Sequence, residues 1–318
     1  MKKYLIFLLA ILLFSCDKQS KVEKAVQEIP IEIKVTRFDQ EFFESKPTDL
    51  PLLKQKYPYF FDTATPNDYW IEKMNNPDWR GLYNESQKNY KDFNNEITEI
   101  EELFKHIKYY FPQVVVPSVY TLIADVNPNS KAIYANNKLL IALEMYLGKD
   151  CKYYQPFPEY QKANFEPRQM MPDIVQSFAF AVLPQSSNTL LSQMIYHGKE
   201  MYLKDILLPS YTDTEKIGYT PNQIQFCQEN EQYIWTQFVE EKMIYSSDTK
   251  LASRFITVAP FSKFYLEIDN ETPGRIGQWV GWQIVKSFVE NNSNVSVKEL
   301  LKMDAKELFE KSKYKPKK

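Results

Sequence analysis

The sequence predicts an α+β fold in which a small early β-sheet packs against a predominantly helical C-terminal part. Within the first 143 residues, runs rich in β-branched side chains have the two-residue period of half-buried strands. After residue 168, apolar residues recur almost throughout at the helical period of about 3.6 residues. Strands followed by helices are typical of α+β proteins. No Gly/Ser-rich linker divides residues 30–312, so we expect a single globular domain there.

Three stretches carry the strand pattern. Residues 31–38 alternate apolar and polar side chains and form the first predicted strand. Two further β-rich runs, 114–126 and 131–143, are separated by residues 127–130 (Asn-Pro-Asn-Ser), whose residue types favour turns. We therefore expect these two runs to form a hairpin. A second turn at Asn136-Asn137 would fold the end of the last run back once more.

Helical periodicity accounts for most of the remaining chain. The expected helices cover residues 50–56, 67–74, 78–110 (intact or broken once), 172–183, 188–208, 221–246 and 273–291, with two short pieces between 296 and 311. The helix at 172–183 is apolar nearly all round, which predicts a central position with Gln176 and Ser177 inside. In the helix at 273–291, Gly277 and Gly281 share a face, which favours close packing against neighbouring elements.

The N-terminus predicts export and lipidation. Two lysines precede an apolar run at residues 4–14, which is too short to span a bilayer comfortably. The ending Leu-Phe-Ser-Cys resembles the bacterial lipobox, in which the cysteine is lipidated and becomes the first residue of the mature protein. We predict a signal peptide at 1–15, lipidation of Cys16 and a lipidated tether at 16–29. The alternative is an uncleaved anchor helix.

The composition excludes several kinds of chemistry. The 318 residues include two histidines, His106 and His197, which lie far apart in the sequence. Neither a three-His zinc site nor an H-E-x-x-H helix is therefore present. A net charge of −2 provides no basic field for nucleic acid. His197 falls on or beside the apolar stripe of the helix at 188–208, where a hydrogen-bonded structural histidine is the favoured interpretation.

Two runs and the lipobox carry a resemblance to a known family. Residues 190–202 read Leu-Leu-Ser-Gln-Met-Ile-Tyr-His-Gly-Lys-Glu-Met-Tyr, Leu-Leu-Pro follows at 207–209, and residues 272–281 read Thr-Pro-Gly-Arg-Ile-Gly-Gln-Trp-Val-Gly. Together they resemble the GldB family of gliding motility lipoproteins in Bacteroidota. The resemblance extends over the whole chain, and its most specific parts are the Gly-Lys and Pro-Gly-Arg-Ile-Gly segments.

This resemblance implies a zincin-like scaffold, because the family is similar to zincin metalloproteases. The implied positions are Gln176 for the first histidine, Ser177 for the glutamate, Phe180 for the second histidine and His197 for the third ligand. Gln binds zinc poorly, Ser cannot replace a carboxylate base and Phe is apolar, whereas zinc hydrolysis needs three protein ligands and a base. The implied protein is a pseudoenzyme with no catalytic residue, no metal and no cofactor.

The family also implies a function in the cell envelope. A lipid-anchored protein facing the periplasm, at the inner or outer membrane, would support gliding motility, with or without a role in linked protein secretion. Its partners would be the membrane, through the lipid, and proteins of the gliding or secretion machinery, but no nucleic acid. Two alternatives stay open. One is a lipoprotein that binds a peptide or glycan in the former metal cleft, and the other is a hydrolase with a displaced site around His197, using carboxylates such as Asp205, Glu240 or Glu241.

Covalent modification is expected at few other residues. An oxidising compartment permits a disulfide between Cys151 and Cys227, but two separate buried thiols are the interpretation that we favour, because Cys227 sits on an apolar helical face. Asp-Thr-Ala at 62–64 resembles the O-glycosylation motif of exported Bacteroidota proteins, which makes Thr63 a candidate acceptor. The lysines of residues 313–318 form a basic tail, either solvated or in contact with anionic lipids.

Overall fold

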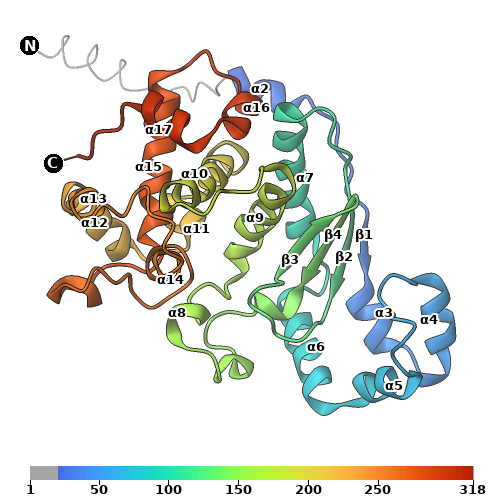
Figure 1. Cartoon of the computed structure of the whole chain (residues 1–318). Coiled ribbons are helices and arrows are strands. Elements are labelled where there is room, and N and C mark those ends of the chain that lie inside the picture. Colours follow the sequence, from blue (N-terminus) through green and yellow to red (C-terminus); the bar gives the residue numbers. More distant parts are fainter. Residues whose placement is uncertain (1–20, 318) are drawn as a thin grey trace, which may run out of the picture.

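The fold contains a small mixed β-sheet beside a large group of helices (Figure 1). The computed structural model describes residues 21–317, and within them the four strands are arranged in the order β1-β2-β4-β3. The strands β1 (Val35–Arg37), β2 (Ser118–Leu122) and β4 (Lys138–Ala142) run parallel, and β3 (Ala132–Ala135) is antiparallel to β4. An early sheet followed by a helical C-terminal part confirms the predicted α+β class.

The predicted hairpin between the runs at 114–126 and 131–143 is wrong. β2 pairs in parallel with β4 and not with the strand that follows it in the chain. The hairpin forms instead at the second predicted turn, where Asn136 and Asn137 have φ values of 50° and 56° and connect β3 to β4. A two-residue type I′ turn needs positive φ at both positions, which asparagine tolerates. Leu139 of β4 is completely buried, which suits a central strand, whereas β3 is half exposed at the edge.

The first strand is shorter than the prediction of 31–38. It is limited to β1, because helix α3 (Phe38–Glu44) begins directly after it. Asp39 lies in the first turn of α3, where a negative charge is favourable. Its buried carboxylate accepts hydrogen bonds from Arg37 Nη2 (2.8 Å) and from the hydroxyl of Thr121 on β2. These bonds hold the turn between strand and helix against the sheet.

The helices of the first half agree with the predictions in position. α4 (Leu50–Lys56) and α5 (Asn67–Asn75) lie where they were expected. The helix predicted at 78–110 is broken once, between α6 (Pro77–Asn89) and α7 (Asn94–Tyr110). Phe93, just before α7, has a φ of 56°, which no α-helix allows, and this conformation separates the two helices.

A further helix lies in the segment expected to be a tether, 16–29. α2 (Lys21–Gln27) packs on α7 and buries Val26 completely. The side-chain amide of Gln27 donates to the carboxylate of Glu102 on α7 at 2.6 Å. The chain from residue 21 onward thus belongs to the folded body, and the predicted signal peptide and Cys16 lie outside the described residues.

The second half is helical, as predicted. Its helices are α8 (Glu159–Lys162), α9 (Met170–Val182), α10 (Leu190–Leu207), α11 (Asp213–Ile217), α12 (Pro221–Glu229), α13 (Glu231–Glu240), α14 (Lys250–Phe255), α15 (Ile276–Asn291), α16 (Val297–Lys302) and α17 (Ala305–Ser312). Short 3-10 helices occur at Pro47–Asp49, Leu143–Met145, Lys152–Tyr154, Pro167–Gln169 and Glu267–Asn270. The helix expected at 221–246 is divided into α12 and α13 at Asn230. Within residues 21–317, no helix is both long and apolar enough to cross a membrane.

Two close contacts set the arrangement of the central helices. α9 lies between the sheet and α10, and α10 in turn crosses α15 (Figure 1). A Cβ added at Gly198 of α10 would lie 2.3 Å from the carbonyl oxygen of Gly281 on α15, so the two backbones touch. This contact confirms the packing role predicted for Gly281. Gly277 packs elsewhere, because a Cβ there would lie 2.9 Å from the carbonyl oxygen of Phe255 at the end of α14.

Candidate functional site

The structure brings together the four residues that the resemblance assigns to the zincin positions. Gln176, Ser177 and Phe180 on α9 and His197 on α10 line one cavity of about 430 Å³, which we call the His197 cavity. Its opposite wall is formed by the loop that leads into β3 and by Ile133 of that strand. These positions therefore form one site in space.

The expectation that α9 is apolar all round and buries Gln176 is wrong. Gln176 is exposed to the cavity, and 80% of the surface of Phe180 is exposed. Ser177 is half buried, and its hydroxyl oxygen accepts a hydrogen bond from the backbone N–H of Tyr134 on β3 at 2.7 Å. A helix packed between a sheet and one other helix needs apolar residues only on the covered faces, and the remaining side of α9 forms the cavity wall.

Glu200 is the centre of the polar contacts in the cavity. Its carboxylate is buried and lies 3.0 Å from His197 Nδ1 and 3.0 Å from the ammonium of Lys204. It also accepts a hydrogen bond from the side-chain amide of Gln176 at 3.2 Å. Burial alone would raise the pKa of Glu200, but the charges of Lys204 and His197 and their hydrogen bonds hold it well below its usual range. Glu200 is therefore an ionised carboxylate, and Gln176, His197 and Lys204 all contact its oxygens.

Glu200 and Lys204 are not among the site residues predicted from the sequence. Their spacing contained the signal, because Glu200 is three residues after His197 and Lys204 is four residues after Glu200. Residues with these separations are neighbours on a helix surface. A second ion pair in the cleft, between Lys131 and Asp173, was also missed; it joins the loop before β3 to α9, which no local pattern reveals.

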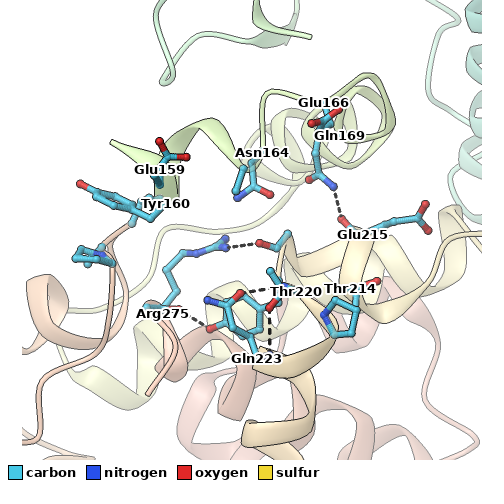
Figure 2. Close-up of a pocket in the computed structure, with 18 of the residues that line it drawn as sticks. Glu159, Tyr160, Asn164, Glu166, Gln169, Thr214, Glu215, Thr220, Gln223 and Arg275 are labelled. Carbon is cyan, nitrogen blue, oxygen red and sulfur yellow. Dashed lines mark hydrogen bonds between the residues drawn. The ribbon is translucent and has the colours of Figure 1, made fainter. Parts of the chain in front are cut away.

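The His197 cavity continues into a longer cleft. A middle cavity of about 300 Å³ shares Lys131, Asp173 and Gln176 with it, and an outer cavity of about 550 Å³ shares Asn164 and Arg275 with the middle one. Figure 2 shows the outer cavity, with the guanidinium of Arg275 reaching toward Asn164 across the space. The cleft therefore runs from the exposed Phe180 to the loop that carries Arg275.

The Gly-Lys pair of the first family-like run has a structural role. Gly198 permits the close crossing of α10 and α15. The buried ammonium of Lys199 donates to the carbonyl oxygens of Leu301 (3.1 Å) and Met303 (2.6 Å), at the C-terminal end of α16. Burial lowers the pKa of Lys199 to about 8. The pair thus fixes α10 to two C-terminal elements, while Glu200, the next residue, faces the cleft.

His106 lies far from the cleft, at the junction of α2 and α7. Its Nδ1 bonds to the backbone oxygen of Glu102 at 2.9 Å, and its Nε2 lies 3.3 Å from the carboxylate of Glu23. The ligand atoms of Glu23, Glu102 and His106 lie within 4.8 Å of one another, a grouping that could hold a metal ion. Gln27 and Lys105 also bond within this group, so the same contacts account for the attachment of α2 to α7.

The other predicted modification sites are separate from the cleft. Cys151 is half buried and Cys227 is fully buried, and both are free thiols in the structure. Thr63 is exposed in a turn in which the backbone N–H of Ala64 donates to the side chain of Asp62 at 3.0 Å. An exposed turn is accessible to a modifying enzyme, and glycosylation of Thr63 stays a prediction.

Comparisons with known proteins give one family. No curated protein and no solved structure significantly matches the chain. A family model described as the gliding motility protein GldB matches residues 19–316, which is nearly the whole chain. The chain therefore belongs to the GldB family of gliding motility proteins, and membership of this family implies a motility-related lipoprotein of the cell envelope.

Proposed function

We propose that the protein is a lipid-anchored, periplasm-facing part of the envelope apparatus that supports gliding motility, and that its zincin-like cleft does not catalyse. Membership of the GldB family supports the motility role. Cys16 in its lipobox supports the anchor. The proposed partners are other proteins of the gliding machinery, with or without components of linked protein secretion.

The polar contacts of Glu200 carry the non-catalytic part of the proposal. A zinc hydrolase needs three protein ligands, an open position for water and a general base. Gln176, Ser177 and Phe180 supply none of these, and His197 is engaged through Nδ1 with Glu200. The buried ammonium of Lys204, 3.0 Å from the same carboxylate, already provides a positive charge that would repel a divalent cation.

The same contacts weigh against a hydrolase with a displaced site around His197. A general base works best when its pKa lies near the working pH. The pKa of Glu200 is held far below that range by Lys204 and His197, and its oxygens are occupied by three donors. Glu240 and Glu241 are exposed at the end of α13 and do not line the His197 cavity. Asp205 binds Lys216 and the indole N–H of Trp282.

A complementation experiment tests the proposal. A gliding strain that lacks its own copy would receive the wild-type chain, Cys16→Ala or His197→Ala, and both colony spreading and protein abundance would be measured. Cys16→Ala should abolish membrane attachment and gliding, whereas His197→Ala should retain gliding at normal abundance. Cys151→Ala is the matched control, because it removes a half-buried free thiol away from the cleft. Capture of the tagged wild-type chain should recover motility proteins, which Cys16→Ala should lose.

Two results would overturn the proposal. Stoichiometric zinc in the purified protein together with peptide hydrolysis that His197→Ala removes would establish an enzyme. Normal gliding of the Cys16→Ala strain, with the chain released from the membrane fraction, would refute a role that depends on the lipid anchor.

A further inference from the structure

We propose that the cleft binds an acidic polypeptide segment, whose carboxylate is held by Arg275 where the middle and outer cavities meet. The backbone, the charges and the lining of the cleft support this binding, whether or not the protein acts in gliding or catalyses a reaction.

The backbone of Arg275 has a conformation that is uncommon for a residue with a side chain. Arg275 has a φ of 64°, in the left-handed region that costs a residue with a side chain about 1 kcal/mol and that glycine adopts freely. The loop is held firmly, because the hydroxyl of Tyr219 donates to the carbonyl of Gly274, and that of Ser262 donates to the carbonyl of Pro273. Backbone strain of this kind clusters at functional sites, but seven other non-glycine residues among 21–317 also have positive φ, so the conformation supports the site only together with the charges and the lining.

The guanidinium of Arg275 has donors to spare. It lies over the ring of Tyr219, 5.4 Å from its centre, and its one hydrogen bond, to the carbonyl of Gly218, is long at 3.4 Å. Among residues 21–317 no carboxylate forms an ion pair with it. Five N–H groups in a planar fork suit a carboxylate, which accepts two of them side by side. Figure 2 shows Arg275 among the side chains that line the outer cavity.

The charges around the middle cavity leave one positive charge in excess. Lys131, Lys204, Lys216 and Arg275 line it, together with the single carboxylate of Asp173. The three lysines are neutralised by Asp173, Glu200 and Asp205, respectively. The charge of Arg275 remains in the middle cavity. The outer cavity adds Glu159, Glu166 and Glu215 against Arg168, so we expect the bound carboxylate on the middle-cavity side of Arg275. One excess positive charge matches a carboxylate better than a phosphate group, which carries about −1.5 to −2 at neutral pH.

The lining favours a polypeptide as the carrier of that carboxylate. Amide side chains, which can both donate to and accept from a peptide backbone, are numerous in the middle cavity: Asn129, Gln161, Asn164, Gln169, Gln176 and Gln278. The last three of these already donate to Glu215, Glu200 and Ile256, respectively, and retain their carbonyl oxygens as acceptors. In the adjoining His197 cavity, Ala132 belongs to the edge strand β3. Its neighbour Lys131 accepts a hydrogen bond from Ala142 on β4, so the alternation of an antiparallel ladder directs the N–H and C=O of Ala132 away from β4. An extended peptide can pair with such groups.

The proposal is tested by titrating the full chain in detergent with short synthetic peptides, using calorimetry. One peptide has an aspartate and an amidated C-terminus, the second has asparagine instead of aspartate with a free C-terminus, and the third has neither carboxylate. We expect saturable binding with a Kd below about 1 mM for at least one of the first two and none for the third. The peptide that binds identifies a side-chain or a terminal carboxylate. Binding should weaken with added salt.

Three variants localise the binding. Arg275→Gly should lower the affinity about 10- to 100-fold, as expected for the loss of a charge-assisted bidentate bond, without loss of folding because glycine suits the left-handed conformation. Arg275→Lys should recover only part of the affinity, because lysine lacks the fork. Arg254→Ala is the matched control. It removes the same charge from a half-buried arginine that donates a hydrogen bond to the carbonyl of Lys263, lies over the ring of Tyr265 and does not line these cavities.

Several outcomes would overturn the inference. Equal affinity of wild type and Arg275→Gly would show that Arg275 does not hold the ligand. Equal binding of all three peptides would exclude carboxylate recognition. Binding of oligogalacturonate or inorganic phosphate with no binding of the acidic peptides would assign the cleft to another ligand class, and no saturable binding of any probe would refute the site.

Discussion

The close crossing of α10 and α15 predicts that the single methyl group added in Gly281→Ala lowers the stability of the protein. A Cβ at this position would lie 1.8 Å from the carbonyl oxygen of Met194 and 2.5 Å from its carbonyl carbon. Ordinary van der Waals contact begins at 3.4 Å, so the two helix backbones would have to separate by about 1.5 Å. Neither obstacle is the flexible end of a side chain, so rotation of a χ angle cannot remove the clash.

The expected cost follows from two opposing terms. Alanine in a helix interior is favoured over glycine by about 0.5–1 kcal/mol. Separation by more than 1 Å loses at least half of the dispersion energy between the facing atoms, and overpacked cores lose about 1–3 kcal/mol or more. Completely buried side chains such as Met194 and Ile284 lie on these two helices. The clash should dominate, with a net loss of about 2 kcal/mol and a fall in Tm of about 5 °C.

The assay is thermal and urea unfolding of the full chain followed by circular dichroism, with Gly81→Ala as the matched control. Gly81 is also inside a helix, α6, and a Cβ there would lie 1.7 Å from the hydroxyl oxygen of Tyr153. That obstacle is the end of a half-buried side chain, which can move. Gly81→Ala should therefore be neutral or slightly stabilising, and the two glycines should differ in sign.

A double-mutant cycle gives the result that would refute this reasoning. A Cβ at Gly198 would lie 2.3 Å from the carbonyl oxygen of Gly281, so both substitutions force the same separation. Once the helices have moved apart for one methyl group, the second should cost less, and the double variant should lose less stability than the sum. Strict additivity, or a Gly281→Ala variant as stable as Gly81→Ala, would mean that the crossing does not limit packing.

Two further predictions concern buried charge. Burial raises the pKa of Glu144 to about 7, above the ordinary 4.5, although the nearby backbone N–H groups of Ala124 and Val126 and the charge of Lys73 favour the ionised form. The free energy of unfolding is therefore highest, as far as Glu144 is concerned, below pH 4.5 and falls by about 3 kcal/mol as the pH rises to about 7. In urea unfolding, the stability of Glu144→Gln relative to wild type should increase over this pH range. A difference that stays constant with pH would contradict the buried charge. Lys204→Met leaves the buried Glu200 carboxylate without its cation and should cost about 3 kcal/mol at pH 7. Adding Glu200→Gln should recover most of that loss, and no recovery would indicate that packing of the lysine stem is responsible.

Sequence periodicity was sufficient to predict the helices, because the buried face of a helix is formed by apolar residues that lie close together in the sequence. The run at 190–202 predicts one continuous helix, and α10 contains all of it. The helical face shared by Gly277 and Gly281 predicts tight packing, and both glycines meet the backbone of another helix. The Asn136-Asn137 turn is likewise a local signal, because both residues tolerate positive φ.

The order of the strands and the cleft could not be predicted in this way. The strand beside β2 is a central strand and is covered on both faces. β4, with its fully buried Leu139, occupies this position, although β3 is nearer to β2 in the sequence. The charge of Arg275 becomes significant only through residues from other elements that surround it, such as Asn164 and Lys216. The prediction that α9 is buried all round is wrong because one face of this helix forms a wall of the cleft. Gln176 lies on that uncovered face.

The two family-like runs, 190–202 and 272–281, each contain one residue for packing and one for the cleft. This predicts which substitutions should affect stability and which should affect peptide binding. Each contributes a glycine to the crossing, Gly198 or Gly281, and each places a charged side chain in the cleft, Glu200 or Arg275. The crossing therefore sets the distance between the groups that line the cleft. Gly281→Ala should weaken both stability and peptide binding, whereas Arg275→Gly should weaken binding alone. If Gly281→Ala lowers Tm and leaves the peptide affinity unchanged, the crossing supports the fold without positioning the cleft.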